Sequence, residues 1–224
     1  MVIGILLCFS DNLLVGFIEV VNIVMSASVE NVDAPLRSFF YASSIDKMGS
    51  RSFKTSIFFT WRGSVYEAVL NIWRSSILIR VKNPGNISSD EEVIEIADAV
   101  RRELIKIFSY ISPEAIVSVV VHNIVAQHRF NYCVNLENVY RYLSTVRNPW
   151  IEFKYRRGGQ EKKVYLPTML IYIYSLDGSK VTAELFPTGS VQIKGTSTMA
   201  MIHSTLSKLE EIIEDSAARV ECVE

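Results

Sequence analysis

The sequence predicts an α+β protein with an open antiparallel sheet, and three observations support this fold class. The tripeptide Asn-Ile-Val occurs twice, at Asn22–Val24 and Asn123–Val125, each time in an apolar segment, and the copies lie 101 residues apart. Alternating apolar segments separated by turn residues follow each copy. A long amphipathic segment then closes each series. Strands followed by a helix, twice in the same order, indicate two copies of one unit.

The composition excludes a disordered or collagen-like chain. Of the 224 residues, 49% are hydrophobic and 21% are charged, and 23 Lys and Arg nearly balance 24 Asp and Glu. A chain of this length can bury enough surface to fold without disulfides or a metal. The three cysteines, Cys8, Cys133 and Cys222, are far apart and form no CxxC or Cys/His motif. We therefore interpret them as buried or incidental thiols in a reducing compartment, and expect no zinc site.

The N-terminal residues 1–16 are expected to form an extension before the first unit. Residues 2–9 and 13–18 are apolar, but Ser10, Asp11 and Asn12 interrupt them. The first run is too short to span a membrane, and it lacks a preceding basic residue and a following cleavage pattern. We expect a pair of β-strands here instead of a signal peptide or membrane span.

The first unit is expected to cover residues 17–112. Its first strand is residues 17–25, and residues 33–45 have helical potential. Arg62-Gly63 lies between two alternating segments and indicates a hairpin, with residues 77–81 as a further strand. Ser88 to Glu92 resemble a capping box that begins a helix. Its apolar face comprises Val93, Ile96, Ala97, Val100, Leu104 and Ile107.

The second unit, residues 113–224, repeats this order. Residues 118–126 form the first strand and 135–146 a possible helix, and the turn at residues 176–179 joins two further strands. A strand at residues 190–195 precedes a helix that begins near residues 196–198. The apolar stripe of this helix comprises Met199, Ile202, Leu206, Leu209 and Ile213. An insertion near residues 150–164 is expected to add a hairpin or an extended loop.

The charges are distributed unevenly despite a net charge of −1. Lys and Arg are in excess in residues 37–82 and 141–194, whereas half of the carboxylates lie in the two closing helices and the tail. If both helices cover one face of the sheet, the strand side is available to a phosphate backbone. The alternative is that charges of both signs lie on solvated faces without functional meaning.

These elements, in this order and twice, resemble the TATA-box-binding protein (TBP) family. The resemblance spans about residues 17–215 and implies a two-repeat saddle, with a curved antiparallel sheet and helices on the convex face. In the family, the Asn and Val of the NIV tripeptide face the minor groove of DNA. The resemblance therefore implies minor-groove contacts by Asn22, Val24, Asn123 and Val125. The family also contacts the minor groove through Val and Thr on the next strand. The resemblance therefore implies contacts there by Ile79 and Val81 in the first repeat and by Gln192 and Lys194 in the second.

The family also inserts apolar side chains between base pairs. The segment Leu185 to Gly189 resembles the turn that carries such a wedge, which makes Phe186 the best candidate. Trp73 takes the corresponding place in the first repeat, without the glycine. The family has a second wedge in each repeat. In the second repeat, Leu166 takes its position and replaces an aromatic ring by an aliphatic side chain, and Phe53 is the candidate for this position in the first repeat. Basic residues expected to contact phosphates are Arg51, Lys54, Arg74, Arg80, Lys162 and Lys163.

No enzyme motif accompanies these features. His122, His128 and His203 do not group with Cys, Asp or Glu at metal-ligand spacing, and none of GxSxG, GxxxxGK[ST], GxGxxG or HExxH occurs. We interpret His122, which precedes Asn123, as structural. We expect no cofactor, no small-molecule substrate and no catalytic activity.

The resemblance implies a transcription initiation factor that bends A·T-rich duplex DNA and binds a TFIIB-like or other transcription factor. Two alternatives stay open: a protein-interaction member of the fold that has lost DNA binding, and an accessory domain of a nucleic-acid enzyme. The departures from the family pattern suit a large DNA virus or a fast-evolving lineage. We expect an intracellular location, in the nucleus or another site of transcription, or in a viral factory.

Overall fold

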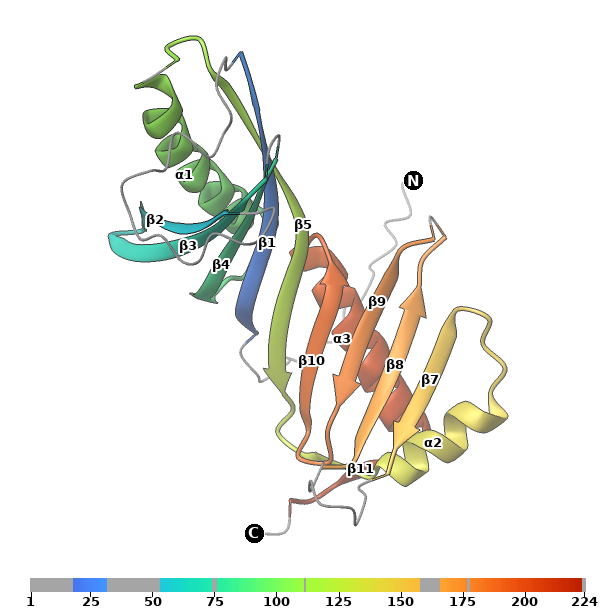
Figure 1. The fold of residues 1–224 in the computed structure, drawn as a ribbon. Coiled ribbons are helices and arrows are strands. Elements are labelled where there is room, and N and C mark those ends of the chain that lie inside the picture. The colour runs from blue at the N-terminus through green and yellow to red at the C-terminus, as the bar shows by residue number, and fades with distance from the viewer. Residues whose placement is uncertain are drawn as a thin grey trace, which may run out of the picture.

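The computed structural model describes residues 18–31, 53–73, 76–110, 112–157, 166–176 and 178–222, and they form a mixed α+β fold built on one large antiparallel sheet. Nine strands form this sheet in the order β2-β3-β4-β1-β5-β10-β9-β8-β7 (Figure 1). The elements are β1 (Glu19–Glu30), β2 (Phe53–Trp61), β3 (Ser64–Ile72), β4 (Ile77–Asn86), α1 (Asp90–Ser109), β5 (Ile116–Arg129), β6 (Cys133–Val134), α2 (Leu136–Thr145), β7 (Ile151–Arg156), β8 (Thr168–Tyr174), β9 (Lys180–Leu185), β10 (Ser190–Thr196), α3 (Met199–Asp215) and β11 (Arg219–Val220).

The two longest strands, β1 and β5, pair at the centre and make the sheet continuous. Ile23 lies opposite Ile124 in the middle of this pair. The register shifts once on either side, between Val20 and Asn22 and between Val24 and Met25. Such bulges add a residue to one strand and increase the local twist. An open, curved sheet results.

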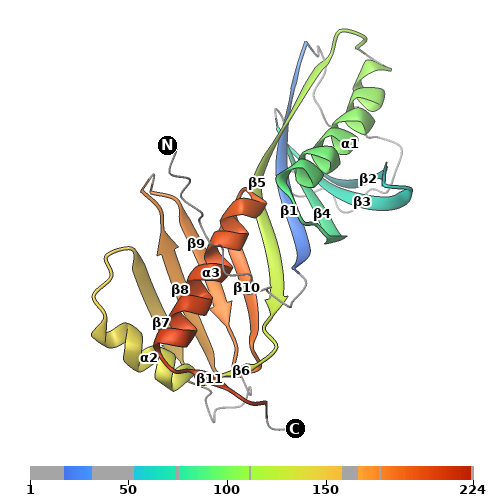
Figure 2. The same ribbon diagram turned by 180° about the vertical axis from the view of Figure 1, so that it is seen from behind.

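Helices α1 and α3 cover the same face of the sheet (Figure 2). Alternate residues of each strand point toward them, as the period of two requires, and form one apolar core with the helices. The N-termini of the two helices meet, because Asp90 in the first turn of α1 accepts a hydrogen bond from the backbone N–H of Met199 at the start of α3. We call the opposite side of the sheet the open face.

Local sequence accounts for the ends of the helices. Ser89 caps α1 and accepts from the N–H of Glu92, whose own carboxylate accepts from the N–H of Ser88. Thr198 caps α3 in the same manner, accepting from the N–H of Met201. The expected apolar stripe of α3 is buried throughout, whereas on α1 the buried stripe is shifted slightly. It comprises Val93, Ile96, Ala99, Val100, Leu104 and Phe108.

The expected hairpins are present. β2 and β3 are joined through Arg62 and Gly63, both with positive φ, the backbone that a two-residue hairpin turn requires. Part of the expected insertion is a regular strand, because residues 151–156 form β7 and pair with β8. The strand pair expected near the N-terminus and the helix expected at residues 33–45 lie outside the described residues.

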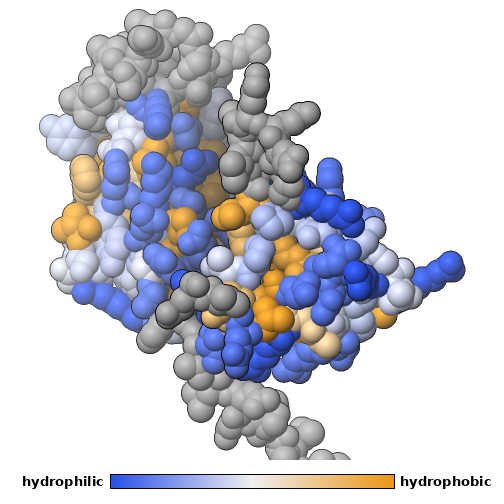
Figure 3. All heavy atoms as spheres, turned by 90° about the horizontal axis from the view of Figure 1, so that it is seen from below, coloured by the Kyte–Doolittle hydropathy of each residue, from blue (hydrophilic) through white to orange (hydrophobic). Residues whose placement is uncertain are grey.

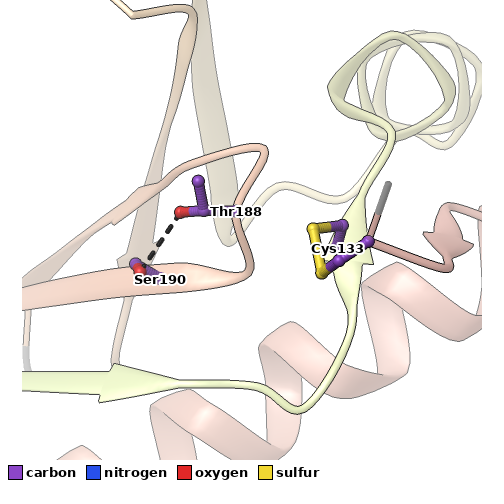
Figure 4. Close-up of a disulfide and its surroundings, with 4 residues drawn as sticks. Cys133, Thr188 and Ser190 are labelled. Atoms are coloured by element: carbon purple, nitrogen blue, oxygen red, sulfur yellow. Dashed lines mark hydrogen bonds between the residues drawn. A yellow bond between two sulfur atoms is a disulfide. The ribbon is translucent and has the colours of Figure 1, made fainter. Parts of the chain in front are cut away.

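The interpretation of the cysteines was wrong for two of them. Cys133 and Cys222 form a disulfide that closes a sequence separation of 89 residues, beside the turn that contains Thr188 and Ser190 (Figure 4). Pairing of β6 with β11 brings the two cysteines together. Sequence spacing did not indicate this, because the pairing depends on where the chain passes after α3. Because these two cysteines form a disulfide, they no longer support the expectation of a reducing compartment. The intracellular location of the protein stays a prediction. Cys8 lies outside the described residues.

None of the helices in the described ranges has the length and apolar character that crossing a membrane requires.

Candidate nucleic-acid interface

The paired asparagines lie at the centre of the open face. On β1, Asn22 and Val24 are half-buried and flank the fully buried Ile23. On β5, Asn123 and Val125 flank the fully buried Ile124 in the same way. Asn22 lies opposite Val125, and Val24 lies opposite Asn123. All four NIV residues expected to face DNA therefore form one patch on the side of the sheet away from the helices.

The two asparagines differ in their partners. The Oδ1 atom of Asn123 accepts a hydrogen bond of 2.8 Å from the backbone N–H of Gly195. Gly195 has a φ of +86°, and a Cβ there would lie 2.6 Å from the carbonyl oxygen of Lys180, so this backbone position requires glycine. The bond leaves the Nδ2 donors of Asn123 for another partner. Asn22 makes no side-chain hydrogen bond with any residue that the structure describes.

Two of the expected base-contacting residues are wrong. Ile79 and Val81 on β4 are completely buried and belong to the core beneath the helices. Their neighbours on β4 form the open face instead: Leu78, Arg80 and Lys82. The predicted positions on β4 are displaced by one residue from the positions that face outward, and a shift of one residue along a strand moves every side chain to the other face of the sheet. The charges of Arg80 and Lys82 were the signal in the sequence that could have corrected it.

In the second half, the two residues expected on the strand next to β5 do lie on the open face. Gln192 and Lys194 on β10 are half-buried and alternate with the buried Val191 and Ile193. Lys194 contacts the carboxylate of Glu184 on β9 at 3.3 Å. This ion pair is partly exposed, so a phosphate can compete for the ammonium group.

The wedge candidates lie at the ends of strands. Trp73 follows β3 and is 38% exposed, and Leu166 precedes β8 and is 63% exposed. Phe186 follows β9 and is half-buried. Phe53 begins β2 opposite Ile72, the residue before Trp73, although its side chain lies outside the described part of the structure. The strand register therefore places the two candidates of each half at the same end of their strands.

The turn that carries Phe186 packs against the segment that follows β5 and forms hydrogen bonds with it. The N–H of Gly189 donates to the carbonyl of Phe186 at 3.1 Å, and the N–H of Val134 donates to the carbonyl of Pro187 at 2.8 Å. A Cβ at Gly189 would lie 2.0 Å from the carbonyl oxygen of Tyr132, so the turn packs closely on this segment. The adjacent disulfide constrains the same segment (Figure 4).

Two of the expected phosphate contacts lie on the open face and are exposed: Lys54 opposite Asn71, and Arg80 opposite Val24. The other four lie outside the described residues: Arg51, Arg74, Lys162 and Lys163. Further basic residues on this face that the sequence reading did not single out are Lys82, Arg129, Lys154 and Arg156.

The helices on the opposite face carry many acidic residues. One basic residue of the strand region, Arg62, forms ion pairs with this face and not with the open face. Arg62 in the β2–β3 turn contacts Glu92 at 2.6 Å and Glu95 at 3.4 Å on α1. Seen from below, hydrophobic residues form patches near the middle and at one edge of the surface, with hydrophilic residues between them (Figure 3). Within the described ranges, no group of three or more His, Cys, Asp or Glu side chains is arranged to hold a metal ion.

The fold can be compared with solved structures. The TBP of Methanococcus jannaschii matches 89% of this chain and 98% of its own, with a TM-score of 0.55 and 20% sequence identity. The protein has a TBP-like fold. No protein-family model matches the sequence, and no curated protein does.

The TBP-like fold accounts for the arrangement of the candidate interface. Each half contributes one long central strand, and the two strands meet edge to edge so that Asn22 and Asn123 lie near the centre of a single uncovered surface. The helices lie on the other side. The candidate interface is therefore continuous across both halves.

Proposed function

We propose that this chain is a TBP-like transcription initiation factor that binds duplex DNA in the minor groove through its open face and bends it. It is built from two TBP-type repeats, residues 17–112 and 113–224. One observation carries the proposal: two half-buried asparagines, flanked by Val24 and Val125, lie at the centre of a continuous sheet on the side that the helices leave uncovered.

The chemistry of this centre fits the minor groove of A·T base pairs. In that groove, adenine and thymine present only hydrogen-bond acceptors, whereas a G·C pair adds the donor of guanine. Asn123 offers donors there because Gly195 already occupies its acceptor oxygen. The flat aliphatic side chains beside the asparagines can pack on the sugar and base edges. Such a centre favours A·T pairs.

The ends of the interface fit bending. Apolar side chains that enter a base step unstack it and kink the duplex, and TBP is a known example of this mode. Trp73 and Leu166 are exposed apolar residues at strand ends, and Phe186 lies on a well-supported turn. Lys54, Arg80 and Lys82 are exposed on the open face, and their positive charges suit contact with phosphates.

The test is binding and bending of short duplexes by the full chain. Fluorescence anisotropy on A·T-rich and G·C-rich duplexes, at several salt concentrations, is expected to show tighter binding to the A·T-rich duplex and an affinity that falls as salt rises. Energy transfer between dyes at the duplex ends is expected to increase on binding. Failure to bind any duplex at low salt contradicts the proposal.

A second function is favoured by a hollow of about 510 Å³ on the helix side of the second half. Trp150, Ile173 and Met201 are among its lining residues, together with Lys208 and Glu211. The lining combines apolar, uncharged polar and charged side chains, a mixture that suits a protein partner. In this alternative, the chain keeps the fold but has lost DNA binding, and it engages a TFIIB-like or other transcription factor. Binding to such a factor in the absence of any duplex binding would favour it.

A further inference from the structure

His122 lies on the open face beside the central asparagines, in a position that the sequence reading assigned to a structural role. Val121 packs against the core and Ile124 is buried in it, so both residues between them, His122 and Asn123, are on the open side. The register confirms this, because Val121 lies opposite Met25 and Asn123 lies opposite Val24, which leaves His122 as the additional residue of a β-bulge. Bulges often redirect a side chain at a functional site.

The imidazole is exposed but held in place. Its Nε2 atom and the hydroxyl of Ser26 share a hydrogen bond of 2.6 Å across the central strand pair. A hydroxyl can donate to a neutral imidazole or accept from a protonated one, so this contact persists in both charge states. Among the described residues, no partner of the Nδ1 atom is found. One ring nitrogen is therefore oriented by the protein, and the other is available to a ligand.

The charged groups around His122 favour an anionic ligand. On β4, which flanks β1, Arg80 lies opposite Val24, and Leu78 lies opposite Ser26. On β10, which flanks β5, Lys194 precedes the Gly195 that contacts Asn123. The carboxylates of the same strands lie farther along: Glu19 and Glu30 at the two ends of β1, and Glu184, paired with Lys194, on β9. The acidic helices lie on the other side of the sheet.

The two halves differ at this position. The residue 101 positions earlier, which precedes Asn22 as His122 precedes Asn123, is Val21. Val21 likewise lies at a bulge, between Val20 and Asn22. A group that can carry charge is therefore present on one side of the central Ile23–Ile124 pair, and an aliphatic group on the other.

We propose that His122 is a DNA-contacting residue that adds one positive charge near the centre of the interface when it is protonated. This inference rests on the proposed function and deepens it. Histidine is the side chain that ordinarily changes charge between pH 5 and 8. A duplex attracts cationic side chains, including histidine, into or beside its minor groove. Binding therefore strengthens as pH falls, and the contact favours one of the two orientations of the duplex on the nearly symmetric sheet.

The experiment measures the affinity of the full chain for one A·T-rich duplex between pH 5.5 and 8.0, at constant ionic strength. We expect binding about three- to tenfold tighter at pH 5.5 than at pH 8.0. The slope of log affinity against log salt should also be steeper at pH 5.5, by up to about 0.9, because one more counterion is displaced. A merely structural histidine would not change this slope.

Three variants separate the contribution of His122 from that of other groups. His122→Gln keeps a hydrogen-bonding side chain that is neutral at every pH and should reduce the pH effect to less than about twofold. His122→Arg keeps a positive charge at every pH and should bind at pH 8.0 as the wild type does at pH 5.5. His203→Gln is the matched control, because His203 is exposed on α3 on the opposite side of the sheet, and it should behave as the wild type.

The outcomes distinguish this inference from the proposed function. Duplex binding by the wild type without pH dependence overturns the role of His122 and leaves the proposed function intact. A pH effect that persists in His122→Gln also overturns it. The absence of binding at every pH contradicts the proposed function itself. If His122→Gln does not fold, the salt slope of the wild type and the affinity of His122→Arg still test the inference.

Discussion

Asn123 and Gly195 are joined by a hydrogen bond of 2.8 Å from the glycine N–H to the asparagine Oδ1, and this bond orients one of the two central asparagines before any ligand binds. Asn22 has no corresponding bond among the described residues. The bond crosses from β5 to β10 at an irregularity in their pairing, where Ile193 lies opposite Ala126 and Thr196 opposite Ile124. The two asparagines should therefore respond differently to substitution.

We predict that Asn123→Asp weakens DNA binding more than it weakens the fold. A carboxylate still accepts from Gly195, but it offers a negative charge where the amide offered donors to the groove. The expected loss is about 1–3 kcal/mol of binding free energy, with only a small change in melting temperature. Anisotropy and thermal melting measure the two effects. Asn123→Ala also removes the bond to Gly195 and should cost about 1 kcal/mol of stability in addition. Wild-type affinity of Asn123→Asp for A·T-rich duplex would contradict this assignment.

We predict that Phe186→Ala and Trp73→Ala reduce DNA bending more than they reduce salt-dependent affinity. The reason is that wedge residues act by deforming base steps, whereas Lys and Arg contact phosphates independently of bending. Energy transfer across the duplex reports bending, and anisotropy reports affinity. Tyr110→Ala is a suitable control, since Tyr110 is a large exposed aromatic residue beyond the end of α1. Equal losses of bending and affinity would be inconsistent with a wedge role.

We predict that the Cys133–Cys222 disulfide stabilises the folded state. A cross-link that closes 89 residues restricts the unfolded chain, and removal of such a bond typically costs about 2–4 kcal/mol. Cys222→Ser, or a reducing agent, should lower the free energy of unfolding in denaturant by this amount. Cys8→Ser is the matched control and should leave the cross-link intact. Peptide mapping without reduction must recover the fragments of Cys133 and Cys222 joined together; separate fragments would show that the bond does not form.

We predict that Glu92 contributes stability that is lost in acid. A hydrogen bond from the backbone N–H of Ser88, together with one from Arg62, holds the pKa of Glu92 below its ordinary value of 4.5. The contribution is therefore complete above pH 4.5 and declines as pH falls through the lowered pKa. Glu92→Gln can keep the hydrogen bond from the Ser88 N–H but loses the charge beside Arg62 and the helix N-terminus. It should therefore reduce the free energy of unfolding by only about 0.5 kcal/mol at pH 7, and its stability should fall less steeply below pH 4.5.

Asp98→Asn provides the comparison for this prediction. Asp98 is exposed on the same helix, and in the described structure it makes no ion pair or side-chain hydrogen bond. The variant should retain the wild-type dependence of stability on pH. An equally steep decline in acid for Glu92→Gln and the wild type would remove Glu92 as the cause.

Particular elements show where sequence reasoning was sufficient. The turn at Arg62-Gly63, the cap at Ser89 and the apolar stripe of α3 follow from local chemistry, and each is present in the structure. The two central asparagines lie on the open face of adjacent strands, where their repetition in the sequence suggested a surface role, and their contact with DNA stays a prediction. By contrast, the assignment of Ile79 and Val81 depended on the register of β4, which the sequence did not specify to within one residue.

The sequence by itself determined the elements that depend on neighbouring residues: strands by alternation, helices by periodicity and caps, and turns by glycine. Only the tertiary structure decided the contacts between segments that are far apart in the sequence. The pairing of β1 with β5 brings Ser26 to His122, the bulge in β10 brings Gly195 to Asn123, and the path beyond α3 brings Cys222 to Cys133. The physical reason is that such contacts require register and chain path across about 70 to 100 residues, and no local propensity encodes these.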